Sequence, residues 1–300
     1  MCDGMSTDNT RTIVNSISEV NTQVILLNNI KQTTPFALNL GLKKSTDDIK
    51  IILGAHAEVD ADFIVENVNA FQIDPNIGCT GGVLENIYEN NTAKIIGYGM
   101  SSEFGVGNAH FRTGNKSGFV DTVAFGAYKS EIFDTIGYFD EQLARNQDDE
   151  FNFRLIKNGY KIYLSNKIHS KYYVRGSFKK LFKQYFQYGF WKVFVNKKHS
   201  TVTSLRQLVP LLFVLFLIFG LLSSLVYKDL AVPFIAGIAL YFLLAFKYAL
   251  VQTKKVHEVV LTIVTFFILH ASYGLGYLKG LLWFMLLNRQ PTKQSESLSR

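Results

Sequence analysis

Cysteine is scarce in this chain of 300 residues, which contains only Cys2 and Cys79. The two cysteines have no metal-ligand spacing, and a reducing compartment requires no disulfide from them. The N-terminus also lacks the apolar segment of a secretory signal, because it begins with acids and small polar residues. We therefore expect the polar part of the chain to remain in the cytoplasm.

Acidic residues are absent from residues 175–206, although this segment carries six lysines. Aromatic residues recur through it at helical spacing, and a basic helix with an aromatic face is typical of a segment that lies at a membrane surface near anionic headgroups. Nucleic-acid binding is the rival interpretation, and it is disfavoured because the segment adjoins an apolar span. The lysines are Lys179, Lys180, Lys183, Lys192, Lys197 and Lys198.

Charged residues are also rare beyond Leu208, where the chain becomes almost wholly apolar. We predict a membrane region at 207–288 with about three helices and a basic polar tail at 289–300. The lysines before Leu208 place the N-terminal side of the first span in the cytoplasm. Lys247 and Lys279 are the charges inside the spans, too few to favour a transporter. Glycines in the third span leave open whether it crosses or turns back. Segments long enough to cross a bilayer, at about 20 residues, are 208–227, 230–250 and 259–287.

Residues 1–174 alternate short apolar runs with polar and glycine-containing segments, which is typical of an α/β domain. The alternation predicts a mostly parallel sheet whose ligands bind at the carboxyl ends of its strands. The expected strands are 24–27, 49–53, 77–80 and 119–126. The expected helices are 10–20, 34–42, 60–69, 129–136 and 148–158.

The run at 146–154 places three carboxylates in consecutive positions, Asp148, Asp149 and Glu150, and follows them with Arg154. Adjacent anions repel one another, so such a run favours a site that holds a cation or keeps one carboxylate ionised as a general base. A solvated helix N-terminus explains the same residues, because acids complement the helix dipole there.

Taken together, these segments resemble the family 2 glycosyltransferases of the GT-A type, and within them the membrane-anchored group similar to the succinoglycan glycosyltransferase ExoA. The resemblance covers about 190 residues and the apolar tail, and it depends on the order and spacing of its motifs. It implies a Rossmann-like mixed sheet that lacks its first strand here, followed by transmembrane helices. The matching segments are 2–8, 33–39, 55–58, 121–128, 146–154 and 184–189.

The resemblance implies roles for three sets of residues. Asp148 is the general base that deprotonates the acceptor hydroxyl, Glu150 is the second acid, and Arg154 orients both by ion pairing. The donor-binding set is Asp3, Gly4, Ser6, Asp8 and Gly126. The acceptor set is Gln184, Gln187 and Tyr188.

The same resemblance implies a divalent cation, Mn²⁺ or Mg²⁺, held by an acidic motif after a strand. Gly54 replaces the first acid of that motif here, and His56 is left as the candidate ligand. The acidic residues that follow His56 can add ligands to this site, or they can belong to a solvated helix start. We expect the metal site to depart from the family pattern.

The implied function is transfer of a sugar from a nucleotide sugar to a lipid-linked or polysaccharide acceptor, in exopolysaccharide or capsule biosynthesis. The implied enzyme is a multi-pass protein of the cytoplasmic (inner) membrane that contacts membrane lipids and no nucleic acid, and its stereochemistry is inverting. The family begins with a strand and helix that have no counterpart before Met1. The alternative is therefore a truncated, catalytically impaired remnant that acts as a membrane assembly partner.

Overall fold

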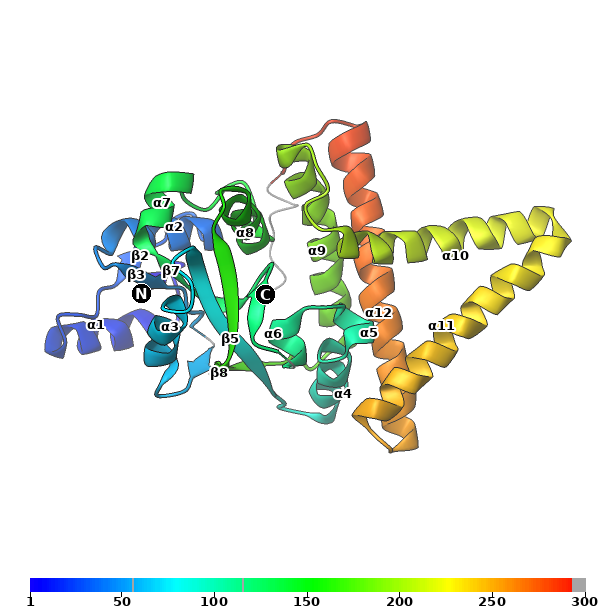
Figure 1. The fold of residues 1–300 in the computed structure, drawn as a ribbon, viewed down its shortest axis with the longest axis horizontal. Helices are drawn as coiled ribbons and strands as arrows, with labels where there is room; N and C mark the ends of the chain where they lie inside the picture. The colour runs from blue at the N-terminus through cyan, green and yellow to red at the C-terminus, as the bar shows by residue number, and fades with distance from the viewer. Residues whose placement is uncertain (56, 115, 293–300) are drawn as a thin grey trace.

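The computed structural model of the chain describes residues 1–55, 57–114 and 116–292. An α/β part lies beside a group of long apolar helices, and α9 and α12 run side by side where the two parts meet (Figure 1). Most of the predicted basic tail, at 293–300, falls outside the described residues.

The central sheet has six strands, in the order β3-β7-β5-β8-β4, with β6 also paired to β8. It is a mixed sheet, as the family resemblance implies. The mostly parallel arrangement expected from strand and helix alternation is wrong, because only β5 and β8 are parallel and the other four pairings in this sheet are antiparallel. A separate parallel pair joins β1 and β2. The strands are β1 Cys2–Asp3, β2 Leu27–Asn28, β3 Ile49–Ile51, β4 Glu58–Val59, β5 Ile77–Ile87, β6 Gly118–Val120, β7 Ala124–Lys129 and β8 Lys161–Tyr173.

The helices of the α/β part begin and end close to the positions that the apolar pattern predicts. The matching helices are α1 Thr10–Val20, α2 Thr34–Lys44, α3 Phe63–Phe71, α7 Ser130–Ile136 and α8 Gln147–Lys157. Three further helices were not expected, namely α4 Asn91–Met100, α5 Glu103–Val106 and α6 His110–Thr113. They lie between the sheet and the apolar helices (Figure 1).

Two apolar layers cover the sheet. The larger joins β5, β7 and β8 to α2, α7 and α8, with Phe133 and Phe151 stacked at 5.3 Å between ring centroids. The smaller packs Phe63, Ala70 and Phe71 of α3 against the sheet. Because Phe151 and Leu155 of α8 are fully buried in the larger layer, the acidic first turn of α8 is held in a fixed position at the sheet edge.

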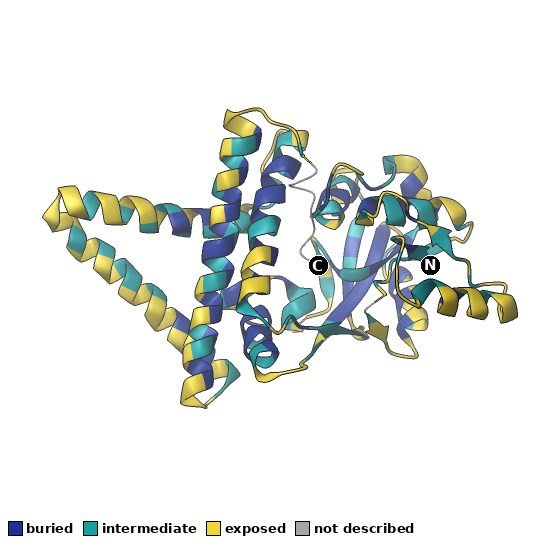
Figure 2. Cartoon of the chain, turned by 180° about the vertical axis from the view of Figure 1, so that it is seen from behind, coloured by how far each residue is buried: buried dark blue, intermediate teal, exposed yellow. Residues whose placement is uncertain are grey.

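Three helical segments are long and apolar enough to cross a membrane: Leu205–Val226, Lys228–Gln252 and Val256–Leu286. They contain η1 Leu205–Leu208, α10 Val209–Val226, η2 Lys228–Leu230, α11 Ala231–Gln252, α12 Val256–Gly280 and the π-helix η3 Leu281–Leu286. α10 and α11 project outward and expose most of their surface (Figure 2). The span containing α12 differs from them because half of its apolar window is buried in protein, against 11% and 6% for the other two.

Helix α9, Phe178–His199, packs along α12. Glycines bring the two backbones together, since a Cβ at Gly189 would lie 2.0 Å from the carbonyl oxygen of Tyr273, and one at Gly276 would lie 2.0 Å from that of Phe186. The expectation that the aromatic face and lysines of this segment all meet the membrane surface needs correction. Much of that face packs on protein, and Lys192 is fully buried.

Candidate active site

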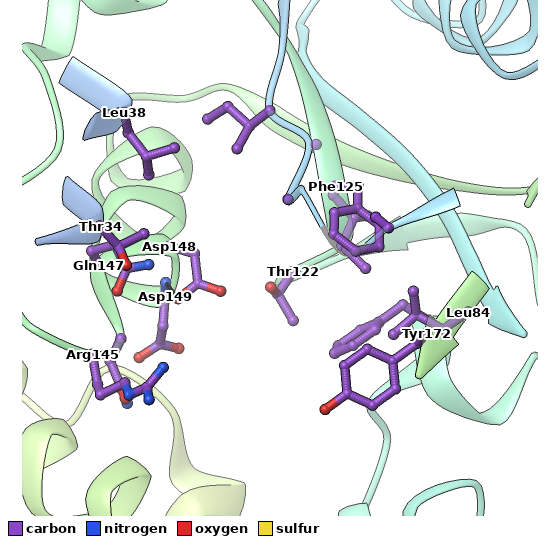
Figure 3. Close-up of a pocket in the computed structure, with 18 of the residues that line it drawn as sticks. Thr34, Leu38, Leu84, Thr122, Phe125, Arg145, Gln147, Asp148, Asp149 and Tyr172 are labelled. Carbon is purple, nitrogen blue, oxygen red and sulfur yellow. Dashed lines mark hydrogen bonds between the residues drawn. The ribbon is translucent and has the colours of Figure 1, made fainter. Parts of the chain in front are cut away.

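A continuous cavity of about 2260 Å³ runs from the start of the chain to the apolar helices. One end, the turn end, is lined by Gly4, Gly54 and neighbouring residues of β1, α2 and β3. The other, the membrane end, is lined by Pro210 of α10 and Tyr273 of α12 together with residues of α9. The acidic turn of α8 lies between Thr34 of α2 and Arg145 on one wall (Figure 3).

Asp148 lies in the first turn of α8 and faces the cavity (Figure 3). The helix begins after Asn146, which adopts a left-handed conformation with φ 60°. The Asp148 carboxylate reaches the cavity, but desolvation by the surrounding protein still raises its pKa. The negative charge of Asp149 raises this pKa further. A carboxylate with a raised pKa in a large cavity is suited to accept a proton.

Asp149 also lines the cavity, and its carboxylate pairs with the ammonium group of Lys192. The Lys192 side chain is 1% exposed. A buried ammonium requires a partner of this kind, because desolvating an unpaired charge is costly. No sequence pattern marks this pair, because Lys192 is one of six lysines in a basic segment.

Glu150 points away from the cavity. It is 3% exposed, and Arg154 binds it through two hydrogen bonds, Nε to Oε1 at 2.7 Å and Nη2 to Oε2 at 2.9 Å. The His199 ring lies 2.9 Å from the same Oε1, and Arg154 also donates to the carbonyl oxygens of Ile136 and Tyr138. The structure therefore brings Arg154 to Glu150, as predicted. Neither residue lines the cavity, whereas Asp148 does.

Asp3 is 3% exposed and holds the turn after β1 together. Its carboxylate accepts hydrogen bonds from the Ser6 hydroxyl at 2.5 Å, the Ser6 amide at 3.1 Å and Arg11 Nη1 at 2.7 Å. These bonds, chiefly that from the Ser6 hydroxyl, lower the pKa of Asp3. Of the predicted donor-binding residues in this turn, Gly4 lines the cavity, whereas exposed Asp8 accepts a hydrogen bond from the Thr10 amide.

Gly126 of β7 lines the cavity, as does Phe125 beside it. A Cβ at Gly126 would lie 2.9 Å from the Tyr128 ring and 3.0 Å from the Cys79 sulfur, so packing also explains the glycine. Phe125 has φ 47°, a conformation that bulky residues rarely adopt. Strain of this kind is concentrated at functional sites.

The predicted acceptor residues lie on α9 at the membrane end. Tyr188 lines the cavity, and its hydroxyl accepts a hydrogen bond from Gln184 at 2.8 Å. Gln184 Oε1 accepts from Arg175 Nε at 3.0 Å, and Gln187 Oε1 accepts from Arg145 Nε at 3.4 Å. The two glutamines therefore act on the cavity through arginines that sequence reasoning did not identify.

The predicted metal position lies at the turn end, where Gly54 and Ala55 line the cavity. His56, the predicted ligand, falls outside the described residues. Within the described part of the chain, no group of three histidine, cysteine or acidic side chains could hold a metal ion. The described residues therefore do not fit a carboxylate-rich divalent-cation site.

Comparison with known proteins identifies the family. The sequence model described as "Glycosyl transferase family 2" matches residues 1–137. A curated protein of Methanococcus voltae is 30% identical over 287 residues, which cover 93% of this chain and 86% of that protein. The chain belongs to glycosyltransferase family 2. This glycosyltransferase is thus an enzyme of the class that its motifs predict.

Two relatives have informative names. The M. voltae protein is a dolichyl N-acetyl-alpha-D-glucosaminyl phosphate 3-beta-D-2,3-diacetamido-2,3-dideoxy-beta-D-glucuronosyltransferase. The succinoglycan biosynthesis protein ExoA of Rhizobium meliloti (strain 1021) is 30% identical over 216 residues, which cover 70% of this glycosyltransferase and 64% of ExoA. The predicted resemblance to ExoA is confirmed.

A solved structure shares the fold beyond the family domain. The mannosyltransferase PcManGT from Pyrobaculum calidifontis, solved with GDP-Man and Mn²⁺, aligns with a TM-score of 0.55 and 18% identity. The alignment covers 93% of this glycosyltransferase and 76% of PcManGT. The GT-A-type fold predicted from the sequence is therefore confirmed.

Proposed function

We propose that this glycosyltransferase moves a sugar from a nucleotide-sugar donor to a lipid-linked acceptor at the cytoplasmic face of a membrane. The observation that carries the proposal is the position of Asp148, in a cavity that joins the Asp3 turn to the apolar helices. A base between a polar turn and a membrane surface can serve a soluble donor on one side and a lipid-borne acceptor on the other.

Asp148 takes the proton from the acceptor hydroxyl. The acceptor oxygen then forms a bond to the anomeric carbon of the donor sugar as the bond from that carbon to the diphosphate breaks, so the nucleoside diphosphate leaves with the bonding electrons. Attack from the face opposite the leaving group inverts the anomeric configuration. The raised pKa of Asp148 strengthens it as a base.

A divalent cation, when bound, would neutralise charge on the leaving diphosphate. The described residues do not supply a cluster of ligands for it, so each step above is assigned to residues of the chain. A cation at Gly54-Ala55-His56 remains a prediction.

The lipid-linked acceptor and the polymer are inferred from the relatives and from the membrane end of the cavity. One relative is named for a dolichyl phosphate-linked sugar and the other for succinoglycan biosynthesis. Pro210 and Tyr273, from segments able to cross a membrane, line the cavity, so the sugar of a lipid anchored in the bilayer would enter from this end and reach Asp148. The proposed process is exopolysaccharide or capsule assembly, with lysine-rich α9 on the cytoplasmic side.

The test is a transfer assay on the full chain in detergent. The protein is given Mn²⁺ or Mg²⁺, a lipid extract and a panel of nucleotide sugars with labelled sugar moieties. We expect one donor to release nucleoside diphosphate in equal amount to the label that enters the lipid fraction. Release without lipid labelling would reject the lipid acceptor, and no turnover with any donor would favour an assembly partner.

A further inference from the structure

Four arginines line the membrane end of the cavity, and each comes from a different part of the fold. Arg112 lies in α6, Arg145 precedes α8, Arg175 precedes α9 and Arg206 lies in η1. Only Arg175 and Arg206 belong to the basic segment predicted from sequence. The convergence is therefore a property of the fold, and it concentrates positive charge where the cavity meets the apolar helices.

Neutral amide side chains contact two of these arginines. Gln184 accepts a hydrogen bond from Arg175, and Gln187 accepts one from Arg145. Among the ion pairs of the described residues, Arg206 pairs with Asp121 at 3.0 Å, and neither Arg112 nor Arg175 has a carboxylate partner. The amide oxygen of Gln184 orients the Arg175 guanidinium group without cancelling its charge, which leaves that charge available to an anion.

Arg112 supplies a direct sign of a missing partner. Its Nη1 atom is buried without a hydrogen bond in the described structure, as is the hydroxyl of Tyr273, which lines the same end of the cavity. The guanidinium group lies over the Tyr172 ring, 5.0 Å from its centroid. Buried donors of this kind are nearly always satisfied, so two of them at one end of a cavity indicate a ligand.

The electrostatics agree with this geometry. Burial lowers the pKa of Arg145, and the positive charge of nearby Arg175 lowers it further. An anion bound between the two guanidinium groups would remove this repulsion. A planar guanidinium group can donate two parallel hydrogen bonds to two oxygens of one phosphate.

We propose that Arg112, Arg145 and Arg175 form a binding site for the phosphate of the lipid-linked acceptor, with Gln184 and Gln187 positioning two of the arginines. This inference rests on the proposed function, whose acceptor it specifies as a prenyl-type phosphate. The adjoining Pro210 and Tyr273 favour a phosphate that carries an apolar chain. The acceptor sugar would then extend from the arginines towards Asp148.

The donor diphosphate is the other source of the same chemistry, and a binding experiment separates the two without any sugar transfer. The full chain in detergent is titrated with farnesyl phosphate, farnesol, inorganic phosphate and nucleoside diphosphates. The variants are Arg112→Gln and Arg175→Gln, with Arg175→Lys as a charge-conserving change. Lys157→Gln removes an exposed charge at the end of α8 and serves as the control.

We expect the protein to bind farnesyl phosphate more tightly than farnesol or inorganic phosphate. Each arginine-to-glutamine change should weaken farnesyl phosphate binding about tenfold, the effect of losing a charge-assisted hydrogen bond. Arg175→Lys should restore part of the loss, and nucleoside diphosphate affinity should stay within about twofold, as expected where no bond is lost. Circular dichroism establishes that the variants are folded.

Equal losses for farnesyl phosphate and nucleoside diphosphate would assign the arginines to the donor and overturn the proposal. Unchanged farnesyl phosphate binding, or equal competition by vesicles of anionic phospholipid, would overturn it as well. Since no transfer is measured, a failed transfer assay with intact phosphate selectivity would count against the proposed function alone. Transfer without phosphate selectivity would count against this site alone.

Discussion

The two ends of the cavity differ in how they use charge. At the turn end, the charged groups of Asp3 and Arg11 satisfy each other, and Lys50, which lines the cavity there, donates to the carbonyl oxygen of Leu42 at 3.0 Å. At the membrane end, Arg112 and Arg175 have no ion-pair partner in the part of the chain that the structure describes. Charge thus builds the structure at the turn end, whereas two arginines at the membrane end keep a charge that is available for a ligand.

This difference indicates how one cavity can handle two substrates. An end lined by aliphatic and uncharged polar residues such as Leu38 and Asn29 suits the planar base and ribose of a nucleotide, which are recognised by shape and hydrogen bonds. An end lined by arginines suits a phosphate close to apolar helices, where low dielectric strengthens the attraction. The acidic turn of α8 lies where both substrates can reach it.

The largest expected effect lies between the two ends. Asp148→Asn removes the proton acceptor while keeping the shape of the side chain, so kcat should fall by about 10² to 10⁴-fold, the range for loss of a general base. Affinities for nucleoside diphosphate and farnesyl phosphate should both be retained. Single-turnover kinetics and the same titrations measure the two quantities, with Asp134→Asn, at an exposed position of α7, as the control. Loss of nucleotide affinity by the same factor would make Asp148 a donor ligand instead of a base.

A smaller effect should be confined to the turn end. Asp3→Asn breaks the ion pair with Arg11 and weakens the bonds from Ser6, so the turn that carries Gly4 loosens. We expect about tenfold weaker nucleoside diphosphate binding, the scale of one charged hydrogen bond, with farnesyl phosphate binding unchanged. Glu19→Gln is the control, because Glu19 is exposed on α1, the helix that follows this turn, and does not line the cavity. Equal weakening of both ligands by Asp3→Asn would erase the distinction between the ends.

Much of the turn end and of α8 could be predicted from the sequence because its signals are local. Apolar runs located β3 and the start of β5, and the family motifs placed Asp148 at the start of a helix. The order and direction of the strands depend on pairings between distant segments, so local patterns do not predict them. β8 was not expected, since it mixes buried and exposed residues over 13 positions, and its pairing with β5 brings together segments about 80 residues apart.

The arginines of the membrane end could not be predicted because they meet only in the folded chain, although Tyr188 of the predicted acceptor set does line the cavity there. Arg112 and Arg175 come from separate elements, and no motif marks either of them. Lys192 is buried because α9 packs on α12 through glycine contacts such as Gly189 with Tyr273. A basic, aromatic sequence gives no indication of which of its lysines such a contact will bury.

The smallest expected effect tests whether this buried lysine tunes the base. The positive charge of Lys192 lowers the pKa of Asp148 and so opposes the effects of burial and of Asp149. Lys192→Met keeps the apolar volume and removes the charge, so the pKa of Asp148 should rise. Activity that requires ionised Asp148 should then be lost at a higher pH on the acidic side, with kcat at high pH little changed.

The pH dependence of kcat/KM measures this shift in the free enzyme. Lys198→Met is the matched control, since Lys198 lies on the same helix and pairs with Asp140 instead of Asp149. If the loss of kcat/KM on the acidic side occurs at an unchanged pH, or shifts equally in both variants, Lys192 only holds α9 against α8. A shift in Lys192→Met alone would show that α9, the helix packed along α12, sets the proton affinity of Asp148. The membrane end would then take part in catalysis as well as in binding.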